Sequence, residues 1–307
     1  MTMVSFSRIL CPIDFSEPSY RALAYAVAFA EWHQARLAVM HVAPSFEPVL
    51  VTPARNEDTG DVVYPVTREN VLEALHRSAK AAGASPSRVE AIADAGATVP
   101  RILDHAASWR ADLLVVGTHG FSGFDHLLLG SVAERLIHKA CCAVLTVPPA
   151  AHAASPAPRA IHRILCPVDF SPSSELAAGF ALDLGRQVGA AVAFLHVVDW
   201  PAGGEPRAHA HFEVPEFRRQ LMADARTQLQ ALVPADPDGP AVSHHVVSGR
   251  PKTQILAHAM EHDTQLVVMG AQGRDGVGLT LLGSTTERVV RDAICPVLTV
   301  RGVPPLM

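Results

Sequence analysis

The chain has 307 residues, of which 49% are apolar and 18% charged, and its formal net charge is −5 at neutral pH. A chain of this length is expected to form two domains, and the composition is typical of a folded protein rather than a disordered one. Because the net charge is negative, we expect neither nucleic acid nor an anionic membrane as a partner. No apolar run reaches the roughly 20 residues of a membrane span, and residues 1–10 lack a signal-peptide pattern, so the sequence predicts a cytoplasmic location.

The first half alternates short apolar runs with longer amphipathic stretches. Strands are expected at residues 7–12, 36–42, 88–93, 112–116 and 143–147. Helices are expected at residues 19–33, 68–82, 99–109 and 131–140, with a long polar loop over 43–67. Strands that alternate with helices predict an α/β fold, an open doubly wound sandwich whose five-stranded parallel sheet has helices on both faces.

The second half repeats the first. The stretch RILCPIDFSEPS at residues 8–19 returns as RILCPVDFSPSS at 163–174, and the pattern of 117–147 returns at 270–300. Strands of the second copy are expected at residues 162–167, 190–197, 241–247, 265–269 and 297–301. We therefore predict domains at 1–149 and 161–303, joined by a Pro- and Ala-rich linker at 150–160.

Glycines follow the fourth strand of each copy in the pattern Gly-x2-Gly-x9-Gly-Ser. Glycine lets successive backbone N–H groups approach an anion, and the helix that begins at the serine adds free N–H donors and a positive dipole end. The pattern predicts a phosphate-binding turn in each copy. Glycines that only serve tight turns are the simpler alternative, which the repetition at identical spacing makes less favoured.

Asp14 and Asp169 end the first strand of each copy, where a carboxylate faces the crevice of a doubly wound sheet. Such a group can accept hydrogen bonds from an adenine amino group or a ribose hydroxyl. The alternative is a local turn or helix cap shared with Ser16 and Ser171, and both roles can hold together.

These motifs, with His-Val at the end of the second strand, resemble the universal stress protein family in its tandem two-domain form. The resemblance implies strand order 3-2-1-4-5 in each copy and a bound ATP, with Mg²⁺ as its counter-ion. It assigns base contacts to Asp14 and Val42 in the first copy and to Asp169 and Val197 in the second. The other nucleotide-binding positions that it implies are Gly117, Thr118, His119, Gly120, Gly130, Ser131, Val132, Gly270, Gln272, Gly273, Gly283, Ser284 and Thr285.

The two predicted sites differ in their loops. Arg274 follows the second glycine turn, whereas the corresponding loop of the first copy has neither Lys nor Arg. A triphosphate in the first site would depend on backbone donors and Mg²⁺. Unequal affinities of the two sites are therefore expected.

No motif for phosphoryl transfer is present, so the sequence gives no catalytic residue. The resemblance favours an ATP-dependent regulatory module of a stress response. Two alternatives remain: a slow Mg²⁺-dependent ATPase, and a scaffold that encloses an apolar ligand with the loops at 43–67 and 199–215. His209, His211 and Glu213 offer metal-ligand types, which loop polarity explains equally well. The last strands of the copies are expected to pair with each other, and a homodimer of the chain is compatible with this arrangement.

Overall fold

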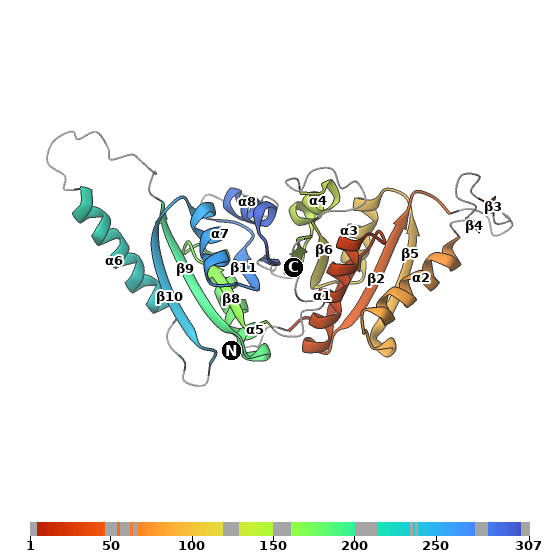
Figure 1. Ribbon diagram of the computed structural model, residues 1–307, viewed down its shortest axis with the longest axis horizontal. Coiled ribbons are helices and arrows are strands. Elements are labelled where there is room, and N and C mark those ends of the chain that lie inside the picture. The colour runs from red at the N-terminus through yellow and green to blue at the C-terminus, as the bar shows by residue number, and fades with distance from the viewer. Residues whose placement is uncertain are drawn as a thin grey trace.

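The computed structural model describes residues 5–46, 54–55, 62–63, 67–118, 129–149, 161–199, 214–233, 236, 239–273 and 282–301. Two α/β units of the same design lie side by side, each with its strands between two layers of helices (Figure 1). Within these residues, no helix combines the length and apolar character that crossing a bilayer requires.

The elements of the first copy follow the predicted order. They are β1 Arg8–Pro12, α1 Glu17–His33, β2 Arg36–Ala43, β3 Ala54–Arg55, β4 Val62–Val63, α2 Arg68–Ala81, a 3₁₀ turn Pro86–Arg88, β5 Val89–Ala95, α3 Thr98–Ser108, β6 Leu113–Gly117, α4 Ser131–Lys139 and β7 Ala143–Val147. One feature corrects the sequence prediction: β3 and β4 form a small antiparallel hairpin inside the stretch expected to be loop. Two-residue strands are too short to produce a recognisable alternation.

The second copy repeats this order without the hairpin and without the 3₁₀ turn among its described residues. Its elements are β8 Arg163–Pro167, α5 Pro172–Val188, β9 Ala191–Asp199, α6 Val214–Leu232, β10 Val242–Gly249, α7 Pro251–Glu261, β11 Leu266–Gly270, α8 Ser284–Asp292 and β12 Val297–Val300. The boundaries differ from the predicted ones by one or two residues at most strand ends.

The sheet topology confirms the predicted order 3-2-1-4-5 in each copy. The first copy runs β5-β2-β1-β6-β7 and the second β10-β9-β8-β11-β12, and all neighbours within a copy are parallel. The strand order changes direction beside β1 and beside β8. In doubly wound sheets this switch point opens a crevice at the carboxyl ends of the strands.

The two copies join through their last strands, as predicted. β12 pairs antiparallel with β7, with Leu298 opposite Leu145, so that both copies share one ten-stranded sheet. Two threonines reinforce the junction: Thr146 Oγ1 donates to the carbonyl of Val297, and Thr299 Oγ1 to that of Val144, each at 3.1 Å. Pairing removes two exposed edges that would otherwise favour aggregation.

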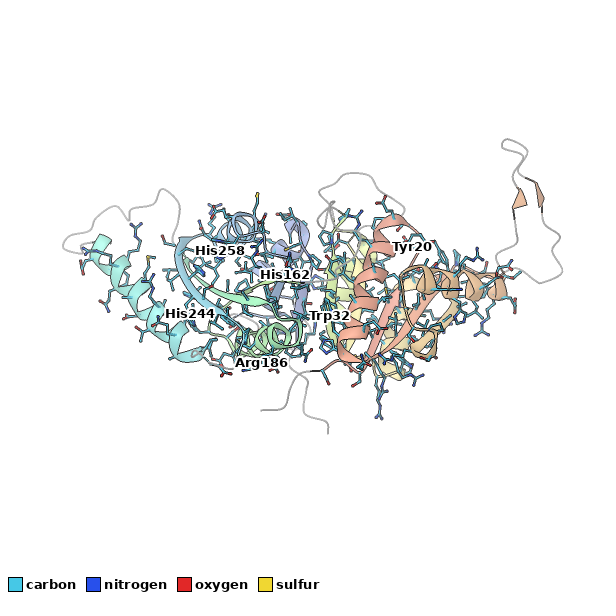
Figure 2. All side chains as sticks on the ribbon, turned by 60° about the horizontal axis from the view of Figure 1, so that its bottom comes forward. Tyr20, Trp32, His162, Arg186, His244 and His258 are labelled. Atoms are coloured by element: carbon cyan, nitrogen blue, oxygen red, sulfur yellow. The ribbon has the colours of Figure 1, made fainter. Side chains whose placement is uncertain are left out.

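The apolar core has two layers, one on each face of the shared sheet. Neighbouring residues of β1 point to opposite faces, so Ile9 belongs to the layer covered by α1, α2, α5 and α6, and Leu10 to the layer covered by α3, α4, α7 and α8. The first layer crosses the junction, because the ring centroids of Phe6 and Phe180 lie 6.0 Å apart. Trp32, which packs against this layer, is labelled in Figure 2.

Serines start the first helix of each copy. Ser16 and Ser171 occupy the N-cap positions of α1 and α5, where their hydroxyl oxygens accept from the amides of Ser19 and Ser174. A proline lies in the first turn of both helices, where no intrahelical N–H bond is lost. These caps fix the point at which the chain turns away from the carboxyl end of the first strand.

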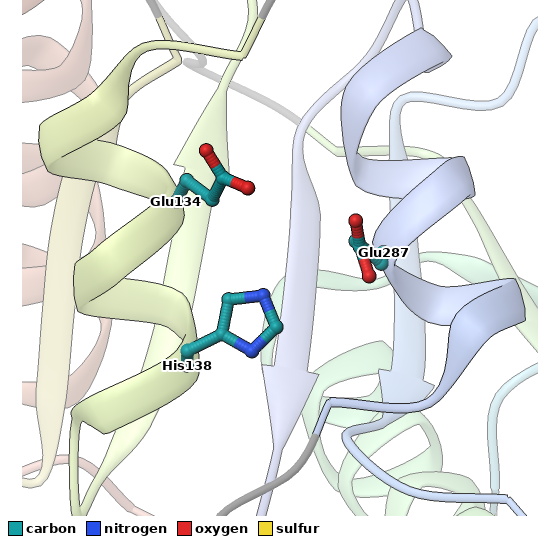
Figure 3. A group of neighbouring side chains, drawn as sticks. All are labelled: Glu134, His138 and Glu287. Carbon is teal, nitrogen blue, oxygen red and sulfur yellow. The ribbon is translucent and has the colours of Figure 1, made fainter.

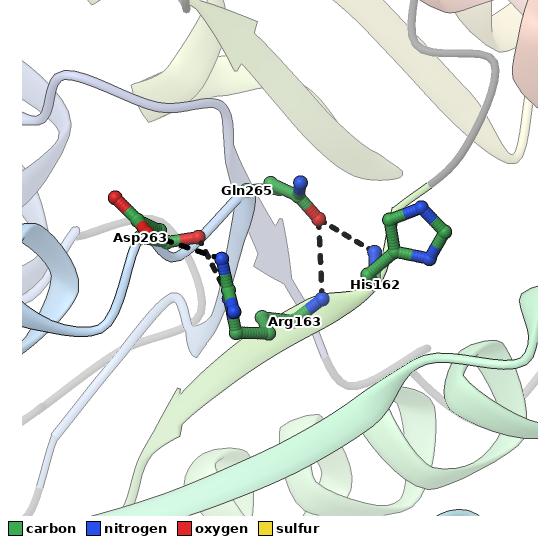
Figure 4. A network of polar contacts seen from close by, with 4 residues as sticks. All are labelled: His162, Arg163, Asp263 and Gln265. Carbon is green, nitrogen blue, oxygen red and sulfur yellow. Dashed lines mark hydrogen bonds and ion pairs between the residues drawn. The ribbon is translucent and has the colours of Figure 1, made fainter.

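In each copy, the amino end of the first strand is held by the side chain of the residue that directly precedes the fourth strand, Gln265 before β11 and Asp112 before β6. Gln265 Oε1 accepts the backbone N–H groups of His162 and Arg163, and Arg163 also pairs with Asp263 at 3.2 Å (Figure 4). In the first copy the carboxylate of Asp112 accepts the amide of Ser7 at 2.7 Å. Burial raises the pKa of Asp112, and hydrogen bonds from the backbone oppose that rise. The amide oxygen of Gln265 and the carboxylate of Asp112 thus accept equivalent backbone hydrogen bonds in the two copies.

Candidate functional site

A cavity of about 710 Å³ opens at the carboxyl ends of β8, β9 and β11 in the second copy. It lies at the switch point of the strand order, and helices α6, α7 and the start of α8 complete its walls. Its volume falls within the range of about 300–1,000 Å³ typical of small-molecule sites.

Every residue that the sequence predicted for the second site lines this cavity. The eight residues are Asp169, Val197, Gly270, Gln272, Gly273, Gly283, Ser284 and Thr285. They come from four separate segments of the chain, so the fold brings together what the sequence only placed at strand ends. Their contact with a ligand stays a prediction.

The first turn of α8 lines the cavity and carries no side-chain cap within the described residues. Gly283 is the N-cap and has no side chain to cap the helix, and its own N–H donates to the carbonyl of Ala271 at 2.7 Å. Thr286 turns its hydroxyl to the carbonyl of Gly270 at 2.9 Å instead of capping the turn. Among the described residues, no side chain caps this turn, so the amides of Ser284 and Thr285 are backbone donors at the positive end of the helix dipole.

The three glycines of the motif serve different ends. A Cβ on Gly270 would lie 2.6 Å from the backbone carbon of Ser173, so this glycine lets β11 pack closely against the start of α5. A Cβ on Gly273 would lie 2.9 Å from Asp169 Oδ2, and one on Gly283 would lie 3.2 Å from the amide nitrogen of Gly273. Close packing of β11 on α5 therefore explains Gly270 without a ligand, whereas Gly273 and Gly283 keep space open between the turn and the helix.

Asp169 holds the turn that follows β8. Its Oδ1 accepts the amide N–H of Ser171 at 3.0 Å and also the hydroxyl of Ser171. Asp14 makes the same two bonds with Ser16 in the first copy. The turn-forming role considered from the sequence is thus confirmed for both aspartates, and the second oxygen of Asp169 faces Gly273 at the cavity.

A phenylalanine with positive φ follows each of these aspartates, a feature that the sequence prediction missed. Phe170 has φ 62° and Phe15 has φ 64°, which is uncommon for a bulky side chain. The ring of Phe170 packs on His196 with centroids 4.6 Å apart, and His196 Nδ1–H donates to the carbonyl of Val168 at 2.7 Å. Backbone strain of this kind collects at ligand-binding sites. The repetition of Asp-Phe after the first strand and His-Val in the second strand of both copies was the sequence signal that could have predicted this packing.

Helix α6 and the end of β9 add acidic groups that sequence reasoning also missed. Asp199 and Asp224 line the cavity together with Gln228. β9 and β11 lie on opposite sides of β8, so the end of β9 and the start of α8 face each other across the cavity. The site therefore has a negative side and a side rich in N–H donors.

The first copy is described only in part. His119 and Gly120 lie outside the described residues, as do His209, His211 and Glu213 of the second copy. Asp14, Val42 and Gly117 lie at the ends of β1, β2 and β6. Gly130 caps α4 as Gly283 caps α8, and its N–H donates to the carbonyl of Thr118 at 2.7 Å.

Two predicted side chains of the first copy have different surroundings. Thr118 is 2% exposed and its hydroxyl donates to the carbonyl of Val147, so its side chain belongs to the packing beneath the turn. Val132 is 39% exposed near the start of α4, next to the exposed Ser131. Thr285 occupies the position of Val132 in the second copy, which replaces a methyl group with a hydroxyl.

Comparisons with known proteins agree with this architecture. The model of the universal stress protein family matches the chain twice, at residues 5–148 and 160–301. A universal stress protein of Mycolicibacterium smegmatis is 30% identical over 299 residues, covering 95% of this chain and 96% of that protein. Universal stress protein Rv2623 of Mycobacterium tuberculosis is 28% identical over 306 residues, with 95% and 96% covered. The crystal structure of a universal stress protein from Archaeoglobus fulgidus has a TM-score of 0.62 at 24% identity and covers 96% of this chain and 98% of its own.

The fold and the cavity define a class: two doubly wound α/β units in tandem, with a small-molecule crevice at the switch point. Because the family model covers both copies and a relative matches along nearly the full length, this chain belongs to the universal stress protein family.

Proposed function

We propose that the chain binds an adenine nucleotide, ATP with Mg²⁺, in the cavity of the second copy, and that occupancy regulates a partner protein in a cytoplasmic stress response. The observation that supports this proposal is the convergence of Asp169, the Gly273 turn and the uncapped start of α8 around one cavity.

The two sides of the cavity suit the two ends of a nucleotide. The amides of Ser284 and Thr285 and the dipole of α8 attract phosphate oxygens. Asp199 and Asp224 on the other side repel phosphate, and Asp169 can accept a hydrogen bond from a base or a sugar. Mg²⁺ would be held mainly by phosphate oxygens and water, as this ion keeps most of its hydration shell.

The proposal concerns binding and not turnover. Two titratable groups of the cavity already have structural partners, since Asp169 Oδ1 holds the turn at Ser171 and His196 Nδ1 holds the carbonyl of Val168. Release of inorganic phosphate from bound ATP would instead favour the slow ATPase that the sequence left open. A purified chain that carries an apolar molecule and no nucleotide would favour the scaffold.

Mass analysis of the ligand released from purified protein tests the proposal directly, followed by calorimetric titration with MgATP. Gly273→Val places a side chain where Asp169 Oδ2 already lies and is expected to weaken binding at the second site at least about tenfold. Gly120→Val makes the corresponding change in the first copy. Two distinguishable losses support unequal sites, and identical losses contradict them.

Gly179→Ala is the matched control, because a Cβ at Gly179 in α5 has no atom within 4 Å. Unchanged MgATP titration in this variant shows that glycine replacement as such does not disturb binding. If Gly273→Val binds MgATP like the wild-type chain, the cavity of the second copy is not the nucleotide site.

A further inference from the structure

Three metal-ligating side chains that are not among the residues lining the cavity meet at the junction of the two copies. Glu134 and His138 lie one turn apart on α4, and Glu287 lies on α8 (Figure 3). One ligand atom from each, a carboxylate oxygen or an imidazole nitrogen, lies within 4.8 Å of the other two. The antiparallel pairing of β7 with β12 brings the two helices to face each other.

Neighbouring arginines balance the charges of this cluster only in part: Arg291 pairs with Glu287, and Arg301 donates to the backbone carbonyls of Ile137 and His138. Glu134 and Glu287 are like charges on facing helices, and all three side chains are half-buried, where repulsion is stronger than in water. Glu287 Oε1 accepts from Arg291 at 2.9 Å. In the part of the chain that the structure describes, Glu134 and His138 have no ion pair or hydrogen bond through their side chains. A cation between the helices would balance both carboxylates.

The departure from symmetry also favours a metal. At the offset that relates residues 117–147 to 270–300, Glu134 corresponds to Glu287, but His138 corresponds to Arg291. Arg291 cannot bind a metal, so it serves as the counter-ion of Glu287 and leaves that residue's second oxygen available. His138 instead adds a nitrogen ligand that can bind a metal without adding negative charge.

We propose that Glu134, His138 and Glu287 bind one Zn²⁺ that links the two copies of the chain. Zn²⁺ is commonly held by imidazole nitrogen and carboxylate oxygen in four-coordinate sites, and water would complete this one. Mg²⁺ prefers an octahedron of oxygen ligands and is excluded as the expected occupant. This site does not depend on the proposed nucleotide site.

A second group of imidazoles must be separated from this site in any test. His245, His258 and His262 lie on β10, α7 and the end of α7, with ring centroids 4.2 to 5.9 Å apart. His258, labelled in Figure 2, is 8% exposed, and its Nε2 has no hydrogen-bond partner. Added Zn²⁺ could also reach these rings, so a variant of His262 belongs in the experiment.

The test is a calorimetric titration of the full chain with Zn²⁺ after chelator treatment and without nucleotide. The wild-type chain is expected to bind Zn²⁺ through the bridging cluster. Glu134→Gln and His138→Gln should each weaken this binding about tenfold or more, and Mg²⁺ should not compete. His262→Gln should leave the bridging site unchanged.

Thermal unfolding separates loss of the ligand from loss of the fold. Glu134→Gln removes a repulsive charge, so the metal-free variant should melt no lower than the metal-free wild type, while the rise in Tm on adding Zn²⁺ should become smaller. The proposal is wrong if the wild-type chain binds no Zn²⁺. It is equally wrong if binding survives Glu134→Gln, His138→Gln and Glu287→Gln together, or is lost only with His262→Gln.

Discussion

The two copies of this chain agree in their backbone geometry and differ in the side chains that a ligand would meet. Both keep the Asp-Ser turn, the positive φ at Phe15 and Phe170, and the glycine cap that precedes α4 or α8. In contrast, the exposed Val132 of the first copy is replaced by Thr285 in the second, in the first turn of the helix that follows the glycine turn. The residues that shape the turns are therefore the same in both copies, whereas residues at the predicted sites, such as Val132 and Thr285, differ.

The largest effect is expected from Gly270→Ala, which tests the part of the motif that is purely structural. Its methyl group would lie within 2.7 Å of backbone atoms of Ser173, so β11 or α5 must move. We expect a loss of about 3 kcal/mol in the free energy of unfolding, measured by urea denaturation. Gly179→Ala, in open space on α5, should be neutral or stabilise by up to about 1 kcal/mol. Equal stability of the two variants would show that Gly270 is not required for packing.

A change of charge at the paired aspartates sharpens the comparison of the two sites. Asn keeps an acceptor for the turn at Ser171 but removes the carboxylate charge that faces the cavity. Asp169→Asn is expected to weaken MgATP binding about tenfold, or about 1.4 kcal/mol, because hydrogen bonds to charged groups are the stronger ones. Asp14→Asn should weaken MgATP binding at the predicted site of the first copy, which calorimetry would resolve as a separate binding step. Identical titration curves for the two variants would remove the distinction between the sites.

Acid is expected to destabilise the second copy through His258. Burial, with smaller contributions from His262 and His245, lowers the pKa of His258 to about 4, below its ordinary value of 6.5. The unfolded chain therefore binds more protons than the folded one between these values, and stability falls as the pH is lowered from about 6.5 to about 4. His258→Leu should reduce the loss between pH 7 and pH 5 by about 1 kcal/mol, measured by urea denaturation with chelator present.

His33 provides the corresponding test in the first copy. Burial lowers the pKa of its imidazole to about 4, and its ring lies 4.9 Å from that of Phe6. If His258→Leu leaves the pH dependence unchanged while His33→Leu removes it, the acid sensitivity belongs to the first copy alone.

The smallest effects are expected at the β7–β12 junction, where two matching threonine hydrogen bonds cross between the copies. Thr146→Val and Thr299→Val each remove one hydroxyl that donates across the β7–β12 pair at 3.1 Å. We expect each change to lower the free energy of unfolding by about 0.5 to 1 kcal/mol, with similar losses in the two variants. If one variant loses much more unfolding free energy than the other, the two threonine hydrogen bonds contribute unequally although their lengths are the same.

The sequence predicted the elements that depend on local pattern and missed those that depend on assembly. The alternation of strands and helices followed from alternating apolar runs, the second-copy residues around Gly273 followed from repeated glycines, and the strand order followed from the resemblance to the family. The contribution of Asp224 could not be predicted, because it requires α6 to lie over the cavity. The cluster at Glu134 and Glu287 could not be predicted either, because helices far apart in sequence meet only through β7 and β12.

The covalent tie between the copies has a consequence for how such a protein can change over time. Where two identical chains associate, every substitution arises twice, once on each side of the twofold axis. Here β7 and β12 make the same kind of contact within one chain, so one side can change while the other is kept. His138 facing Arg291's helix, and Arg274 without a counterpart, are changes that a symmetric pair could not acquire singly. Because the two copies are in one chain, their corresponding surfaces can carry different residues and take different functions.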